Sequence, residues 1–105
     1  MKLPKSLIIG GVKWKVVIKK LSSGGAFYWH NHLIEISKKH TDERRFQALI
    51  HEIVEVILAN NIMRYQKGWA SAPDNGDYIF VFNHDQFEVF TDELSGVLKQ
   101  FMRPQ

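Results

Sequence analysis

Apolar and polar residues alternate near the start of the chain. In the segment 12–19, apolar side chains at the even positions alternate with lysines at 13, 15 and 19. This is the pattern of a β-strand with one buried face and one mostly solvated face. Gly10 and Gly11 separate the segment from the apolar run 6–9. A two-residue Gly-Gly link between β-rich runs predicts a β-hairpin.

Other extended segments are predicted further along the chain. The β-rich stretch 27–37 is expected to bend at Asn31, and its second half, 32–37, has the stronger strand pattern. The segment 61–77 contains glycine, proline and an Asp-Asn-Gly sequence, so it is expected to be a loop. The short aromatic run 78–82 predicts a strand or an extended segment.

Apolar residues recur at steps of three and one in two later segments, which predicts two amphipathic helices. The first helix is expected over about 42–60, where Thr41 or Asp42 can cap its start. Its apolar stripe consists of Phe46, Leu49, Ile50, Ile53, Val54, Ile57 and Leu58. The second helix is expected from about 85 to 102, and the residues able to cap it are Asn83, His84 and Asp85.

These elements predict an α+β fold, in which an antiparallel sheet of three to four strands packs on two helices. The 105 residues fit one domain spanning the chain. Hydrophobic residues make up 45% and charged residues 24%, as in ordinary globular proteins. Because no apolar segment is long enough to span a bilayer, we expect a cytoplasmic protein without a membrane partner.

The absence of cysteine restricts the chemistry that the chain can support. Disulfides are excluded, and so are zinc sites built on thiolates. A bound metal ion would have to be held by His, Asp or Glu side chains.

Charge is distributed unevenly along the chain. The net charge is +3, but residues 1–34 contain six lysines and no acid, whereas residues 74–105 contain six acids and two bases. A basic N-terminal hairpin can attract nucleic acid or an acidic partner. Lysines that share one side of a strand are more often a solvated face, so nucleic acid is the less favoured partner.

The strongest chemical signal is the sequence His51-Glu52-Ile53-Val54-Glu55 within the first predicted helix. Residues four apart lie one turn apart on the same helix face, so His51 and Glu55 can direct a nitrogen and an oxygen at one metal ion. Glu52 lies at the edge of that face, where it can contact a metal-bound water. This is the layout of the H-E-x-x-H helix of zinc peptidases, in which the glutamate is the general base.

Catalytic zinc usually takes three protein ligands and keeps one position for water. His84 is the predicted third ligand, because its position three residues before Phe87 directs it roughly toward the core face of the second helix. Glu88, one turn later, is the alternative.

The order of elements, together with Ala48-Leu49-Ile50-His51-Glu52-Ile53-Val54-Glu55, resembles that of the small gluzincin-like metallopeptidases. These include the minigluzincins and the peptidase domain of the phage-repressor-cleaving ImmA/IrrE group. The resemblance implies zinc held by His51, Glu55 and His84, with Glu52 as general base. It also implies an edge strand that pairs with extended substrate, carried over to Leu33, Ile34, Glu35, Ile36 and Ser37.

This chain departs from the family motif, which ends in His where Glu55 stands here. An additional ligand carboxylate lowers the charge at the metal and makes its bound water less acidic. The leading hypothesis is a Zn²⁺-dependent peptidase acting on a peptide or protein substrate. One alternative is a catalytically silent metal-binding or scaffold domain of the same fold. The other is a nucleic-acid-binding module that uses the basic N-terminal hairpin.

Overall fold

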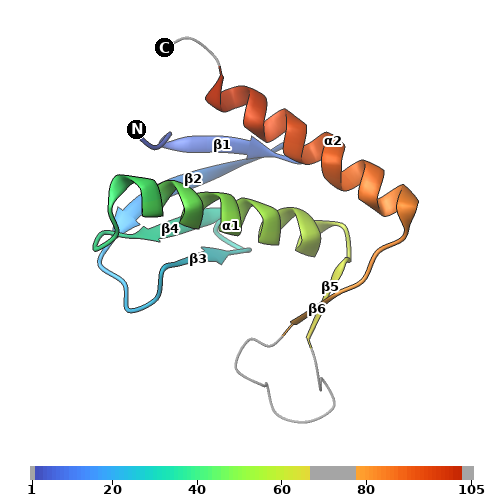
Figure 1. Ribbon diagram of the computed structural model, residues 1–105, viewed down its shortest axis with the longest axis horizontal. Helices are drawn as coiled ribbons and strands as arrows, with labels where there is room; N and C mark the ends of the chain where they lie inside the picture. The colour runs from blue at the N-terminus through green and yellow to red at the C-terminus, as the bar shows by residue number, and fades with distance from the viewer. Residues whose placement is uncertain (1, 67–77, 103–105) are drawn as a thin grey trace.

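The computed structural model describes residues 2–66 and 78–102. A four-stranded sheet forms one layer, and two helices form a second layer on one of its faces (Figure 1). A separate two-stranded ribbon follows the first helix. The elements in chain order are β1 (Ser6–Ile9), β2 (Val12–Lys19), β3 (Gly25–Tyr28), β4 (Leu33–Ser37), α1 (Asp42–Asn60), β5 (Arg64–Gln66), β6 (Tyr78–Phe80) and α2 (His84–Phe101).

The predicted Gly-Gly hairpin is confirmed. β1 and β2 pair antiparallel, with Ile9 opposite Val12. Gly10 and Gly11 have φ angles of 57° and 81°. Positive φ at both central residues is what a tight two-residue hairpin turn requires, and glycine adopts it without a steric penalty.

The α+β class, the four strands and the two helices agree with the prediction, but the sheet is mixed rather than purely antiparallel. Its strand order is β1-β2-β4-β3. β2 and β4 are parallel, with Val16 opposite Ile34, and β3 and β4 are antiparallel. Apolar alternation predicts which face of a strand is buried but does not predict its neighbour. The parallel pair arises because the chain passes from β2 to the far edge as β3 and then turns back.

The prediction that Leu33–Ser37 is an edge strand able to pair with substrate is wrong. This segment is β4, which lies between β2 and β3 and is hydrogen-bonded on both sides. Four of its residues are buried, and Ile34 and Ile36 are fully enclosed. A strand with two neighbours has no edge to offer a substrate. Within the described residues, the strands at the sheet edges are β1 and β3.

The core lies between the sheet and the two helices. α1 contributes most of the helical side of this core, whereas Val97 is the only fully buried residue of α2. Trp14 is 2% exposed and meets the ring of Phe27 edge-on, which ties β2 to β3 across β4. The buried apolar residues are Leu7, Ile9, Trp14, Val16, Ile34, Ile36, Leu49, Ile53, Val56, Ile57 and Val97.

The helix boundaries follow from local capping. Thr41 caps α1, and its hydroxyl accepts a hydrogen bond from the backbone N–H of Arg44. Asn83 caps α2 in a reciprocal capping box with Gln86. Side-chain oxygens at these positions satisfy N–H groups that have no partner inside the helix. The capping box selects Asn83 from the three predicted caps and makes His84 the first helical residue.

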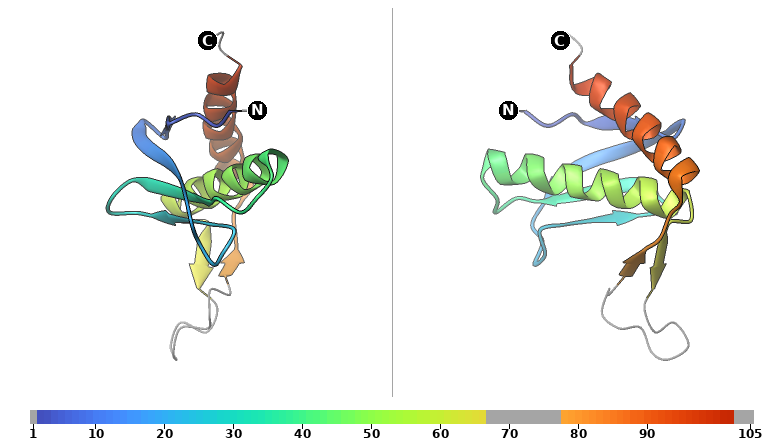
Figure 2. Two further views of the ribbon diagram at one scale, coloured as in Figure 1. Left: turned by 90° about the vertical axis from the view of Figure 1, so that its left-hand side faces the viewer. Right: turned by 45° about the vertical axis from the view of Figure 1, so that its right-hand side comes forward.

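The segment after α1 differs in part from the expected loop. β5 lies inside the predicted loop 61–77 and pairs antiparallel with β6, which begins at the predicted extended run. Residues 67–77 of that predicted loop lie outside the described residues. The β5–β6 ribbon projects from the two layers at the end of α1 (Figure 2). Neither described helix is long and apolar enough to cross a membrane.

Candidate functional site

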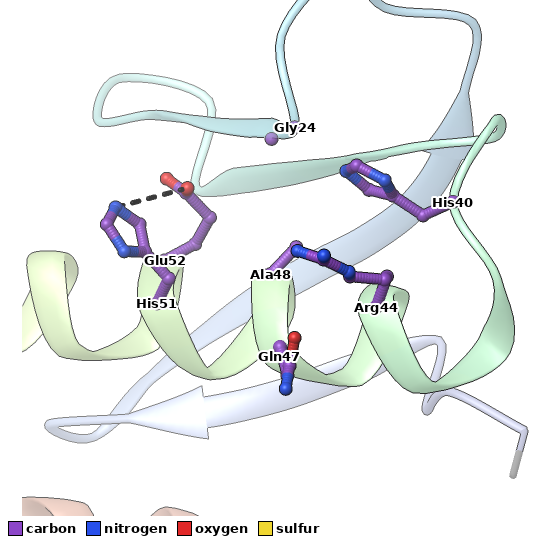
Figure 3. Close-up of a pocket in the computed structure, with 8 residues that line it drawn as sticks. Gly24, His40, Arg44, Gln47, Ala48, His51 and Glu52 are labelled. Carbon is purple, nitrogen blue, oxygen red and sulfur yellow. Dashed lines mark ion pairs between the residues drawn. The ribbon is translucent and has the colours of Figure 1, made fainter.

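A cleft of about 370 Å³ lies between α1 and the start of β3. It contains the first two residues of the predicted motif, His51 and Glu52 (Figure 3). Two glycines form its strand side, and polar residues from successive turns of α1 form its helix side. The complete lining consists of Gly24, Gly25, His40, Arg44, Gln47, Ala48, His51 and Glu52.

Glu52 is directed from α1 toward the sheet. Glu52 is only 7% exposed, although the sequence pattern places it at the edge of the apolar stripe of α1. A Cβ atom added to Gly25 would lie 3.3 Å from Oε2 of Glu52 and 3.1 Å from the carbonyl oxygen of Glu35. Glycine at position 25 therefore gives the carboxylate of Glu52 the room it occupies against β3.

His51 lies at the mouth of the cleft. Its Nε2 atom is 4.0 Å from Oε2 of Glu52, and the two side chains are 69% and 9% exposed. The pair carries opposite charges whenever the imidazole is protonated. A polar group of a ligand entering the cleft can therefore contact an exposed imidazole and a largely buried carboxylate together.

Glu55 is turned differently from His51. It is partly buried, and its Oε1 atom is screened from solvent. The helical spacing of four residues is as predicted, yet Glu55 does not line the cleft that contains His51 and Glu52. Of the two predicted helix ligands, His51 lines the cleft and Glu55 does not.

The predicted third ligand, His84, does not join this site. It lies at the start of α2, beyond the end of α1 and away from the middle turn that carries His51 (Figure 1). Its side chain is 80% exposed, and its Nδ1 atom is 3.5 Å from Oε1 of Glu88. The capping box at Asn83 fixes where α2 begins, so the first turn faces solvent instead of the core.

Among the described residues, His51, Glu55 and His84 do not form a cluster of three ligand atoms that all lie within 4.8 Å of one another. Within residues 2–66 and 78–102, the one group of three His, Asp or Glu side chains with ligand atoms within 4.8 Å of one another is His84, Asp85 and Glu88. All three of its residues are exposed, and it contains neither helix ligand of the motif. Zinc binding by His51, Glu55 and His84 stays a prediction.

The His84–Glu88 turn has a simpler explanation than metal binding. Asp85 lies in the first turn of α2, where acidic side chains stabilise the N-terminal end of a helix dipole. His84 and Glu88 are an exposed i, i+4 pair on the same turn, of a kind that supports an isolated helix.

Sequence reasoning did not identify three polar residues of the cleft: His40, Arg44 and Gln47. Arg44, Gln47 and His51 are spaced by three and four residues, so they form a polar stripe beside the apolar stripe of α1. That spacing was a usable signal. The contribution of Gly24 and Gly25 was not predictable, because it depends on β3 lying against α1.

Comparisons with protein-family models, with curated proteins and with solved structures gave no significant match. The resemblance to gluzincin-like peptidases therefore depends on the five-residue motif and the order of elements alone.

Proposed function

We propose that this chain is a peptide-binding domain that holds an extended segment of another protein in the cleft between β3 and α1 and does not cleave it. The observation that carries the proposal is the position of β3. It is the last strand at its end of the described sheet, and the cleft containing Glu52 and His51 opens directly beside it.

Backbone geometry at the start of β3 supports binding by strand addition. The N–H of Ser37 donates to the carbonyl of Gly24 at 3.0 Å, so the peptide groups of Gly24 face β4. Along an antiparallel pair, the N–H and C=O groups of successive residues point alternately toward and away from the partner strand. The N–H and C=O of Gly25 therefore point away from β4. An extended peptide can add to such an edge through its main chain, while neighbouring pockets select its side chains.

The charges in the cleft favour an acidic ligand group. Arg44 and two histidines, His40 and His51, line one cleft with a single carboxylate, that of Glu52. A guanidinium group can form two parallel hydrogen bonds with a carboxylate. Arg44 is exposed, so its guanidinium group is accessible to a ligand. We therefore expect the bound segment to carry an Asp, a Glu or a C-terminal carboxylate that contacts Arg44.

Zinc-dependent peptide hydrolysis is the second candidate function. The contact between His51 and Glu52 beside an edge strand favours it, because a histidine ligand and a general base would be needed together. Peptide binding without cleavage is favoured because His51, Glu55 and His84 do not form one close group of three ligand atoms among the described residues.

Selection from a random peptide library, followed by fluorescence polarisation with a selected peptide, tests both candidates. Arg44→Ala should weaken binding about tenfold, as expected for loss of a charge-assisted hydrogen bond, whereas Lys99→Ala on α2 should have no effect. Mass spectrometry of the peptide after incubation with and without Zn²⁺ should find it intact. Zinc-dependent cleavage that disappears in Glu52→Gln would establish the peptidase instead, and failure to select any peptide would contradict both candidates.

A further inference from the structure

The face of the four-stranded sheet opposite the two helices is basic. Both helices lie on one side of the sheet, as the turned views show (Figure 2). Trp14 and Val16 of β2 point into the core on that side. Because side chains alternate along a strand, Lys13, Lys15 and Lys19 point to the other side, which no described helix covers.

Glu35 is the one acid in the four described strands of the sheet, and it is paired with Lys19. Glu35 of β4 is 6% exposed, and its Oε2 atom is 3.5 Å from Nζ of Lys19. The hydroxyl of Tyr28 donates a hydrogen bond to the same carboxylate, which raises the pKa of Tyr28 above 10.0. Among the described residues, no ion pair connects Lys13 or Lys15 to a carboxylate. Their charges therefore remain available to an external anion.

These two lysines border a hollow of about 420 Å³. The backbone N–H of Lys15 donates to the carbonyl of His32 at 2.9 Å, which holds the 31–32 turn against β2. The hollow combines three lysines with other polar residues, and its volume falls in the range of small-ligand sites. Its lining consists of Lys5, Ser6, Lys13, Lys15, Asn31 and His32.

An aromatic ring lies on the same face, across the sheet from the hollow. Lys15 is opposite Leu33, and Leu33 is opposite Tyr28, so the three residues form one row across β2, β4 and β3. Two strand spacings separate Lys15 from Tyr28, roughly 10 Å. Tyr28 is 44% exposed, so part of its ring is open to a ligand.

We propose that this basic sheet face binds single-stranded nucleic acid, independently of the cleft on the helix side. Phosphate groups would contact Lys5, Lys13 and Lys15, and a base would stack on Tyr28. A lysine-lined surface combined with an exposed aromatic ring is the arrangement that binds single strands without base-specific contacts. A duplex would leave Tyr28 unused, because its bases are already stacked on one another.

Fluorescence anisotropy with a labelled 15-nucleotide oligothymidylate tests this proposal. Lys13→Gln/Lys15→Gln should weaken binding at least tenfold. The matched control, Lys38→Gln/Lys99→Gln, removes the same net charge away from this face and should weaken binding less than threefold. The slope of log affinity against log salt should become shallower by about 1.4 in the first variant, because each lost phosphate contact contributes about 0.7 for a single strand. All four lysines are exposed, so both variants should retain the far-UV circular dichroism of the wild type.

Substitutions at Tyr28 separate stacking from charge. Tyr28→Phe keeps the ring and should bind within about twofold of the wild type, whereas Tyr28→Leu should lose at least fivefold. Equal losses in the two lysine pairs would overturn the proposal, since binding would then depend only on net charge. Equally tight binding of a 15-base-pair duplex, or of an acidic polyglutamate peptide, would also overturn it.

Discussion

Nε2 of His51 lies 4.0 Å from Oε2 of Glu52, although one side chain is 69% exposed and the other 9%. Consecutive residues of a helix diverge by about 100°, so this contact requires Glu52 to turn toward β3 and His51 to lean over the mouth of the cleft. Glu55 lies one turn further along α1 and does not line the cleft. The motif thus places an acid and an imidazole together without assembling the predicted three-ligand metal site.

The first prediction concerns zinc. Protein purified without a chelating resin and dialysed should retain far less than one zinc per chain, because His51, Glu55 and His84 do not form one close group of three ligand atoms in the described structure. In isothermal titration, His51→Ala and the control His40→Ala should behave like the wild type. About one zinc per chain by elemental analysis, lost in His51→Ala but kept in His40→Ala, would restore the peptidase hypothesis.

The second prediction concerns the contact between α1 and β3. Gly25→Ala should destabilise the protein by about 1–3 kcal/mol, since the new methyl group would lie 3.1 Å from a backbone oxygen and 3.3 Å from Glu52 Oε2. It should also weaken peptide binding in the cleft.

Gly24→Ala is the matched control, and urea unfolding is the measurement for both variants. A Cβ atom at Gly24 would meet Nε2 of His40 at 3.1 Å, and that ring can rotate away. We expect a change within about 0.5 kcal/mol. Similar stabilities for the two variants would contradict the close packing of Glu52 against Gly25.

The third prediction concerns alkaline pH. The hydrogen bond from Tyr28 to Glu35 raises the pKa of the phenol in the folded state above its ordinary 10.0. The stabilisation is therefore fully present below pH 10 and is lost as the pH rises through the folded-state pKa. Urea unfolding from pH 8 to pH 11 should show the free-energy gap between wild type and Tyr28→Phe shrinking only above about pH 10. A gap that stays constant to pH 11 would mean that the hydrogen bond does not form.

The fourth prediction concerns the core that positions the cleft. Ile53 is fully buried one residue after Glu52, so Ile53→Ala should cost about 2–5 kcal/mol of unfolding free energy. Ile8→Ala removes the same atoms from a side chain that is 54% exposed and should cost less than about 1 kcal/mol. Equal costs in chemical denaturation would contradict the assignment of α1 to the core.

Local sequence patterns predicted the β1–β2 hairpin and both helices, but not β5 or the division of the stretch 27–37 into β3 and β4. Two-residue alternation specified the faces of β2, positive-φ glycines specified the β1–β2 turn, and steps of three and one specified both helices. These features depend on residues within a few positions of one another, so the sequence carries them directly. The motif His51-Glu52 and its location on α1 followed from the same local information.

Only the tertiary structure decided which elements are neighbours. The parallel pairing of β2 with β4 turned the expected edge strand, Leu33–Ser37, into an internal one and left β3 beside the cleft. His84 is the first residue of α2, its side chain is 80% exposed, and it does not line the cleft that contains His51 and Glu52. Strand order and helix placement depend on how all the apolar faces close together around one core, and no spacing within a single segment encodes that outcome.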